Sequence, residues 1–325
     1  MQRGDGAIRR LESIQALRFV AAALVILCHV WDPAKIGAVG VDIFFVISGF
    51  IISRVMVGKT AAAFLRARFT RIYPIYWICA IPTAILAAYI GAITLPRTLT
   101  SITLWPAFGG AYLQPYLVVG WTLSFEMLFY ICAAMALVDR RALLAIALGY
   151  PLAMLGAFLT GEAVLRFIGN PLIIEFLMGV AIGRFASTGK GRAGVAAIGA
   201  AVVLLAISNA ERLYLPRNIF DLTAPERVLA WGVPAAMLVW GALQIDARNW
   251  RLLPYLGDAS YSIYLTHGTA VFLFAFLPWP LKAVAAVAFG VAVFRYVETP
   301  LLARLRRQPS ESGDVGTAVS GVSNA

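Results

Sequence analysis

The sequence is poor in charge: 13% of its residues are Asp, Glu, Lys or Arg, whereas a soluble domain carries about 25%. It contains 16 acidic residues and two histidines in 325 residues, while 61% of its residues are hydrophobic. Such a chain has too little polar surface to cover itself, which excludes an ordinary soluble domain. Apolar runs of about twenty residues recur from near residue 14 to near residue 303, long enough to cross a hydrocarbon core of about 30 Å.

Cysteine is also scarce, and the three cysteines show no paired spacing. Cys28, Cys79 and Cys132 fall inside apolar runs, so we interpret them as small core residues and expect neither a disulfide framework nor a metal site. The net charge of +11 comes from basic residues distributed between the apolar runs. Because they do not gather on one soluble domain, we expect no nucleic-acid partner.

The hydropathy pattern predicts an all-α, polytopic integral membrane protein with about ten transmembrane helices and the lipid bilayer as its surroundings. Basic residues are more than twice as frequent at one set of span ends, so the positive-inside rule predicts cytosolic N- and C-termini. We expect one transmembrane domain over residues 1–307 and a disordered cytosolic tail over 308–325. The predicted spans lie near 14–31, 39–57, 72–94, 118–138, 142–160, 170–187, 192–209, 227–245, 255–277 and 279–303.

Several ionisable residues lie inside these spans, where each costs about 3 kcal/mol and therefore suggests a functional site. Arg18 and His29 are eleven residues apart, on one helix face and about 16 Å apart along the axis. A histidine accepts a proton from a hydroxyl near neutral pH when a partner fixes its tautomer. We predict Glu126 as that partner; the alternative is that a neighbouring carbonyl or hydroxyl satisfies His29.

Two further arginines precede the third span. Arg68 and Arg71 are three residues apart, so their guanidinium groups face the same side and can fork onto phosphate oxygens. A lipid-anchoring role explains the pair equally well when it is taken alone. Because Arg18 is expected at the same depth, we favour an anion site at the cytosolic mouth.

Polar residues on other spans give weaker signals. Tyr261, Tyr264 and His267 recur at threes on an apolar helix and are expected to face protein. Asp42 is a candidate for an acceptor pocket, whereas Ser48 lies outside any nucleophile-elbow pattern and is expected to pack or hydrogen-bond. We expect Arg295 and Glu298 to neutralise each other, and Glu175 has no assigned partner.

The order of these residues resembles the membrane-bound acyltransferase-3 family over roughly residues 11–303. The resemblance is carried by the Arg18 to His29 spacing, Gly40-Val41-Asp42-Ile43-Phe44-Phe45-Val46-Ile47-Ser48-Gly49-Phe50, Arg68-x-x-Arg71, Trp121-Thr122-Leu123-Ser124-Phe125-Glu126, Tyr261-Ser262-Ile263-Tyr264-Leu265-Thr266-His267 and Glu298-Thr299-Pro300.

The resemblance implies a ten-helix acyltransferase of the bacterial inner (plasma) membrane. Its donor substrate would be acyl-coenzyme A, with acetyl-coenzyme A expected first, and it would hold no permanent cofactor. Its acceptor would be a sugar hydroxyl of exopolysaccharide, lipopolysaccharide or a lipid-linked glycan, and the chain is most similar to the exopolysaccharide-production subgroup. By resemblance, His29 is the catalytic histidine, Glu126 an essential acid, and Arg18, Arg68 and Arg71 the donor-binding group.

The chain lacks the outer hydrolase-like domain of larger relatives, which leaves open whether a partner in a polysaccharide-synthesis complex presents the acceptor. Candidates for the acceptor or the pocket wall are Asp42, Ser48, Tyr264 and His267. We expect His29 to act as general base for direct attack, with a covalent acyl-histidine as the alternative. A transporter or flippase of lipid-linked or acidic glycans is the rival function, and a non-catalytic scaffold is a second rival.

Overall fold

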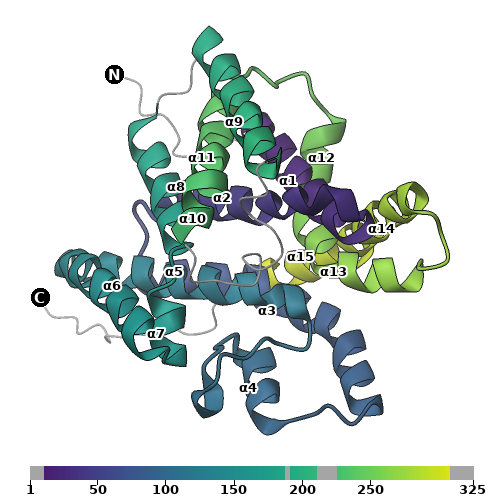
Figure 1. Ribbon diagram of the computed structural model, residues 1–325, viewed down its shortest axis with the longest axis horizontal. Coiled ribbons are helices and arrows are strands. Elements are labelled where there is room, and N and C mark those ends of the chain that lie inside the picture. Colours follow the sequence, from purple (N-terminus) through teal and green to yellow (C-terminus); the bar gives the residue numbers. More distant parts are fainter. Residues whose placement is uncertain (1–10, 187–190, 211–224, 308–325) are drawn as a thin grey trace, which may run out of the picture.

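The computed structural model describes residues 11–186, 191–210 and 225–307, so the predicted tail over 308–325 lies outside the described residues. Within these ranges the chain forms helices and connecting turns, with no strand, which confirms the all-α class (Figure 1). The longer helices are α1 (Glu12–Val30), α2 (Val39–Val55), α3 (Ala61–Tyr89), α5 (Trp121–Val138), α6 (Arg141–Thr160), α8 (Ile173–Phe185), α9 (Arg192–Ala210), α13 (Ser260–Leu273) and α14 (Trp279–Val293). The shorter elements are η1 (Asp32–Ala38), α4 (Leu95–Thr103), η2 (Phe108–Gly110), η3 (Val118–Gly120), α7 (Ala163–Ile168), α10 (Pro225–Arg227), η4 (Val228–Gly232), α11 (Val233–Ala242), α12 (Leu252–Asp258), η5 (Phe294–Glu298) and α15 (Thr299–Arg307).

Eight helical segments of the described chain are long and apolar enough to cross a membrane, so the protein is a polytopic membrane protein. The other two predicted spans, near 227–245 and 255–277, each coincide with two or three consecutive shorter helices. The first consists of α10, η4 and α11, and the second of α12 and α13. The number of ten spans and the cytosolic termini stay predictions.

The helices α1 and α2 form an antiparallel hairpin closed by η1. A Cβ atom on Gly40 would lie 2.2 Å from the carbonyl oxygen of Ala21, and one on Gly37 would lie 2.2 Å from that of Leu24. Small residues of this kind let helix backbones approach closely where lipid supplies no hydrophobic drive. The close approach fixes the register: Gly40 lies beside Ala21, and the residues after Gly40 lie beside the N-terminal half of α1.

The segment that contains α2 is the most enclosed of the eight, because 78% of its most apolar stretch is buried. In Figure 1 it crosses the middle of the molecule, between α8 and α11 on one side and α5 on the other. Its contact with α8 again depends on glycine, because a Cβ on Gly49 would lie 2.0 Å from the carbonyl oxygen of Phe176. Gly179 makes the reciprocal approach to Val46, so α2 is locked between its neighbours.

Helix α3 begins earlier than the predicted span near 72–94. Thr60 caps its N-terminus, with its Oγ1 accepting a hydrogen bond from the backbone N–H of Ala63 at 3.3 Å. Arg68 and Arg71 therefore lie inside the helix, one turn apart, and both line the cavity described below.

Candidate active site

A cavity of about 500 Å³ lies between α1, α2, α3, α5 and α13. Arg18 from α1 and Arg68 and Arg71 from α3 all line it, so the structure brings the predicted donor-binding group together; we call it the arginine cavity. The remaining wall consists of Gln15, Val41, Phe44, Phe45, Ile47, Ser48, Ile51, Ile52, Ile72, Thr122, Leu123, Glu126, Tyr130, Asp258, Ser260, Tyr261, Tyr264 and Phe294.

Two of the three arginines keep donors for a ligand. Among residues 11–186, 191–210 and 225–307, neither Arg18 nor Arg68 forms an ion pair with a carboxylate. Nη1 of Arg18 donates to Oε1 of Gln15 at 3.0 Å, and the buried Nε of Arg68 has no hydrogen-bond partner. An unpaired guanidinium group in a cavity is a strong donor for phosphate or carboxylate oxygens.

Arg71 is held differently, because its Nη1 lies 3.5 Å from Oε1 of the fully buried Glu298. Oε2 of Glu298 accepts a hydrogen bond from Oγ of Ser262 at 2.6 Å. Within the described residues Glu298 pairs with Arg71 and not with Arg295, so the predicted neutralisation of Glu298 by Arg295 is wrong. The segment η5 is a π-helix, whose wider turn places residues three apart on different faces.

Glu126 lies on the wall of the arginine cavity and not beside His29. Its Oε1 accepts hydrogen bonds from Oγ of Ser48 at 3.0 Å and from the hydroxyl of Tyr130. Ser48 thus has the hydrogen-bonding position that the sequence predicts. The carboxylate is fixed from α2 and from its own helix, facing the same space as the arginines.

His29 is exposed and lies in the last turn of α1. Its Nδ1 lies 2.7 Å from the carbonyl oxygen of Val25, one helical turn earlier. A carbonyl oxygen can only accept, so Nδ1 carries the proton and Nε2 of the neutral ring keeps a lone pair. The expected pairing of His29 with Glu126 is therefore wrong in this structure: a backbone carbonyl fixes the tautomer, as the alternative reading of the sequence anticipates.

The neighbour of His29 is the second histidine. The rings of His29 and His267 meet edge to face, with centroids 4.8 Å apart. His267 is fully buried, and its Nδ1 is bonded to the carbonyl oxygen of Tyr264, while its Nε2 has no hydrogen-bond partner in the part of the chain that the structure describes. Both intramembrane histidines thus meet at the C-terminal end of α1, and neither lines the arginine cavity.

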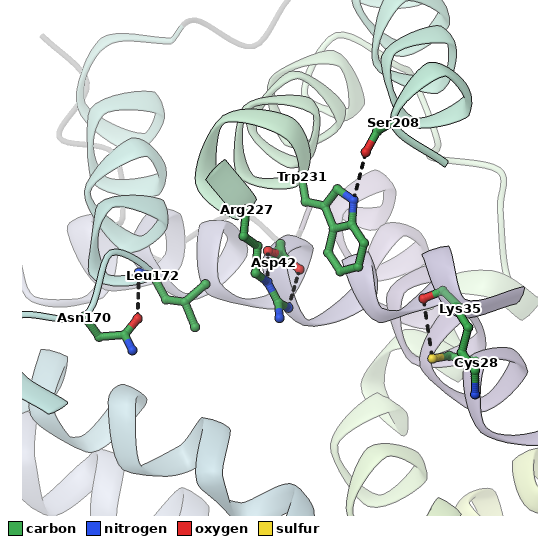
Figure 2. Close-up of polar contacts among 8 residues, drawn as sticks. All are labelled: Cys28, Lys35, Asp42, Asn170, Leu172, Ser208, Arg227 and Trp231. Carbon is green, nitrogen blue, oxygen red and sulfur yellow. Dashed lines mark hydrogen bonds and ion pairs between the residues drawn. The ribbon is translucent and has the colours of Figure 1, made fainter. Parts of the chain in front are cut away.

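Asp42 is fully buried and belongs to a separate ion pair rather than to the arginine cavity. Nε and Nη2 of Arg227 donate to its two carboxylate oxygens, each at 2.9 Å, as Figure 2 shows. Glu175 is also fully buried and packs against Gly232, one turn beyond Arg227. The counter-charge of the buried Asp42 on α2 therefore comes from Arg227 of α10, which lies 185 residues later in the chain.

Arg227, Tyr130 and the role of Glu298 were not predicted from the sequence. The signal for Arg227 was present, because a buried aspartate needs a cation and Arg227 lies at the start of a predicted span. The signal for Tyr130 was its spacing of four residues from Glu126, which puts both on one helix face. Nothing local in the sequence indicates which helix faces Glu298.

Known proteins point to the same chemistry. Residues 11–295 match the acyltransferase-3 family model, described as an acyltransferase domain. The exopolysaccharide production protein ExoZ of Rhizobium meliloti is 35% identical over 310 residues, covering 87% of this chain and 95% of ExoZ.

Two more distant relatives also carry transfer activities in their names. The acyltransferase MdmB of Streptomyces mycarofaciens is 24% identical, over 79% of this chain and 78% of MdmB. The putative membrane-bound transacylase BcsY of Komagataeibacter xylinus is 26% identical, over 89% and 81% respectively. No solved structure matches the chain. The chain belongs to the membrane-bound acyltransferase-3 family and is an acyltransferase that transfers groups other than aminoacyl groups.

Proposed function

We propose that this protein transfers an acyl group, acetyl in the first instance, from acyl-coenzyme A to a sugar hydroxyl of an envelope glycan. The observation that carries the proposal is the arginine cavity, in which Arg18 meets Arg68 and Arg71 from a helix about fifty residues away. Coenzyme A carries several phosphate oxygens at one end and a thioester at the end of a long arm. A cavity with three arginines on its wall suits the phosphate end of that molecule.

The phosphates bind at the arginine end. Arg18 and Arg68 donate to phosphate oxygens, while Arg71 keeps a fixed position because Glu298 holds its guanidinium group from behind. Asp258 and Glu126 line the same cavity, so its three arginines exceed its carboxylates by one positive charge. The anionic donor therefore binds against the arginines and away from these carboxylates.

His29 is the general base in this proposal. The acceptor hydroxyl reaches the exposed imidazole, and its proton passes to Nε2 of His29 as its oxygen attacks the thioester carbonyl carbon. The bond between that carbon and sulfur breaks, and the departing thiolate takes the proton back from the imidazolium. The carbonyl of Val25 keeps Nδ1 protonated throughout, so Nε2 both accepts the proton from the hydroxyl and returns it to the thiolate.

Glu126 acts on the donor side. Ser48 and Tyr130 hold its carboxylate toward the cavity, where it accepts a hydrogen bond from an amide or hydroxyl group of the donor arm. A positioning role of this kind affects the Michaelis constant for the donor more than it affects the proton transfer at His29.

The acceptor is a saccharide of exopolysaccharide, lipopolysaccharide or a lipid-linked precursor, made at the bacterial inner membrane. Support comes from the similarity to ExoZ, which is named for exopolysaccharide production and is matched along nearly its whole length. A polysaccharide-synthesis complex would present that acceptor at the face where His29 is exposed.

The test is turnover of radiolabelled acetyl-coenzyme A by the purified protein in proteoliposomes with a glycan acceptor. We expect label in the glycan and release of free coenzyme A, both lost in His29→Ala. A transporter or flippase would instead move glycan without consuming thioester. A scaffold would show neither activity, and either result would refute the proposal.

A further inference from the structure

The arginine cavity has a polar end and an apolar end. The arginines, Gln15 and Asp258 define the polar end, near the N-termini of α1 and α13. Thr122 and Leu123 at the start of α5 and Val41 at the start of α2 define the other end. An elongated donor with its phosphates on the arginines therefore has its acyl group among apolar side chains.

Phe44 closes that apolar end toward α1. Gly40 lies beside Ala21, and Phe44 is one turn further along α2, so its backbone lies beside the α1 turn that carries Arg18. The ring packs against the hydrophobic cluster of Ala22 and Ile26. The α1 face between Arg18 and His29 is covered at this point, because Ala22 is 0% and Ile26 is 1% exposed.

Tyr264 holds Phe44 in place. Its ring meets Phe44 edge to face with centroids 5.6 Å apart, and its hydroxyl is bonded to Oγ1 of Thr122 at 3.1 Å. The other side of Tyr264 faces His267, with ring centroids 5.6 Å apart, and His267 contacts His29. The rings thus follow one another in the order Phe44, Tyr264, His267 and His29. Of these four, Phe44 and Tyr264 line the arginine cavity.

Resting on the donor proposed above, we propose that Phe44 is the specificity-determining residue for the acyl group. Its ring is the wall against which the acyl chain of the bound thioester ends. A short acyl group fits between the end of the donor's arm and this ring. Each added methylene presses on a side chain that Tyr264 fixes from behind, so longer acyl groups are rejected.

The test compares acetyl-, butyryl- and hexanoyl-coenzyme A as donors for the full chain in proteoliposomes. We expect Phe44→Ala to raise the ratio of hexanoyl to acetyl kcat/KM at least about tenfold, the usual scale for discrimination by methylene groups in an apolar pocket. Phe44→Leu, which keeps most of the packing, should shift the ratio in the same direction and serves if the alanine variant fails to fold. The matched control is Phe167→Leu, a buried phenylalanine of α7 that does not line the arginine cavity.

The outcomes separate this inference from the function on which it depends. Turnover by the wild type with an acyl preference unchanged in both Phe44 variants overturns the inference and leaves the donor assignment standing. A shift of equal size in Phe167→Leu also overturns it, because loosened packing would then explain the change. Absence of turnover of every thioester by the wild type removes the donor assignment, and this inference with it.

Discussion

Replacing Asp42 with Asn should strongly destabilise the protein, because it leaves the Arg227 cation buried without its main counter-charge. The two side chains are 0% and 2% exposed and share two hydrogen bonds of 2.9 Å. Breaking a buried pair from one side costs about 3–5 kcal/mol. We therefore expect a loss of at least about 3 kcal/mol, the lower bound of that range.

The measurement is thermal unfolding in detergent, followed by fluorescence-detected size-exclusion chromatography. At about 2 °C per kcal/mol for a chain of this length, a loss of about 3 kcal/mol lowers Tm by roughly 6 °C. The double variant Asp42→Leu with Arg227→Met removes both charges and should recover most of the loss. A Tm of Asp42→Asn equal to that of the wild type would show that the buried Arg227 does not depend on Asp42. A Tm of the double variant below that of either single variant would show the same.

Three other consequences follow from the contacts described above. Gly49→Ala should lower the folded yield in the same chromatography, since its Cβ would lie 2.0 Å from the carbonyl oxygen of Phe176. Gly199→Ala on α9 is the control and should leave the yield unchanged, because its Cβ would meet nothing within 4 Å. His29→Ala should reduce kcat for transfer by about 10²–10⁴ while coenzyme A still binds, because the imidazole lies outside the arginine cavity. Weakened binding of coenzyme A in equilibrium dialysis would count against that separation. The KM for acyl-coenzyme A should rise with added salt while kcat stays level, since ionic screening weakens the contact between arginine and phosphate; a KM independent of ionic strength would argue against phosphate binding there.

The sequence was sufficient to predict the helical class and the grouping of three arginines. Arg18, Arg68 and Arg71 are costly near lipid, so their spacing and expected depth limited them to a few arrangements, and the structure gathers them in one cavity. The span count was harder to predict. Hydropathy treats 255–277 as one apolar run, whereas the chain forms α12 and α13 as separate helices there.

The partners of the buried polar groups could not be predicted from spacing. Glu126 has the depth expected of a partner for His29, but depth does not determine which face of α5 meets which helix, and that face turns to Ser48. The carbonyl of Val25 is available to His29 in any helix, so it leaves no trace in the sequence. Similarly, the π-helix η5 rotates Glu298 away from Arg295 and toward Arg71, a local change that an α-helical pattern does not predict.

The most direct test of the account is equilibrium binding of coenzyme A to the purified protein without acceptor, comparing wild type with Arg68→Gln. The lost hydrogen bond between a charged group and phosphate is worth about 1.5–3 kcal/mol, so we predict binding weaker by about 10- to 100-fold. Arg66→Gln is the matched control, because Arg66 is on the same helix but exposed and outside the arginine cavity. Equal affinity of wild type and Arg68→Gln, or an equal loss in both variants, would contradict the assignment of the arginine cavity as the donor site.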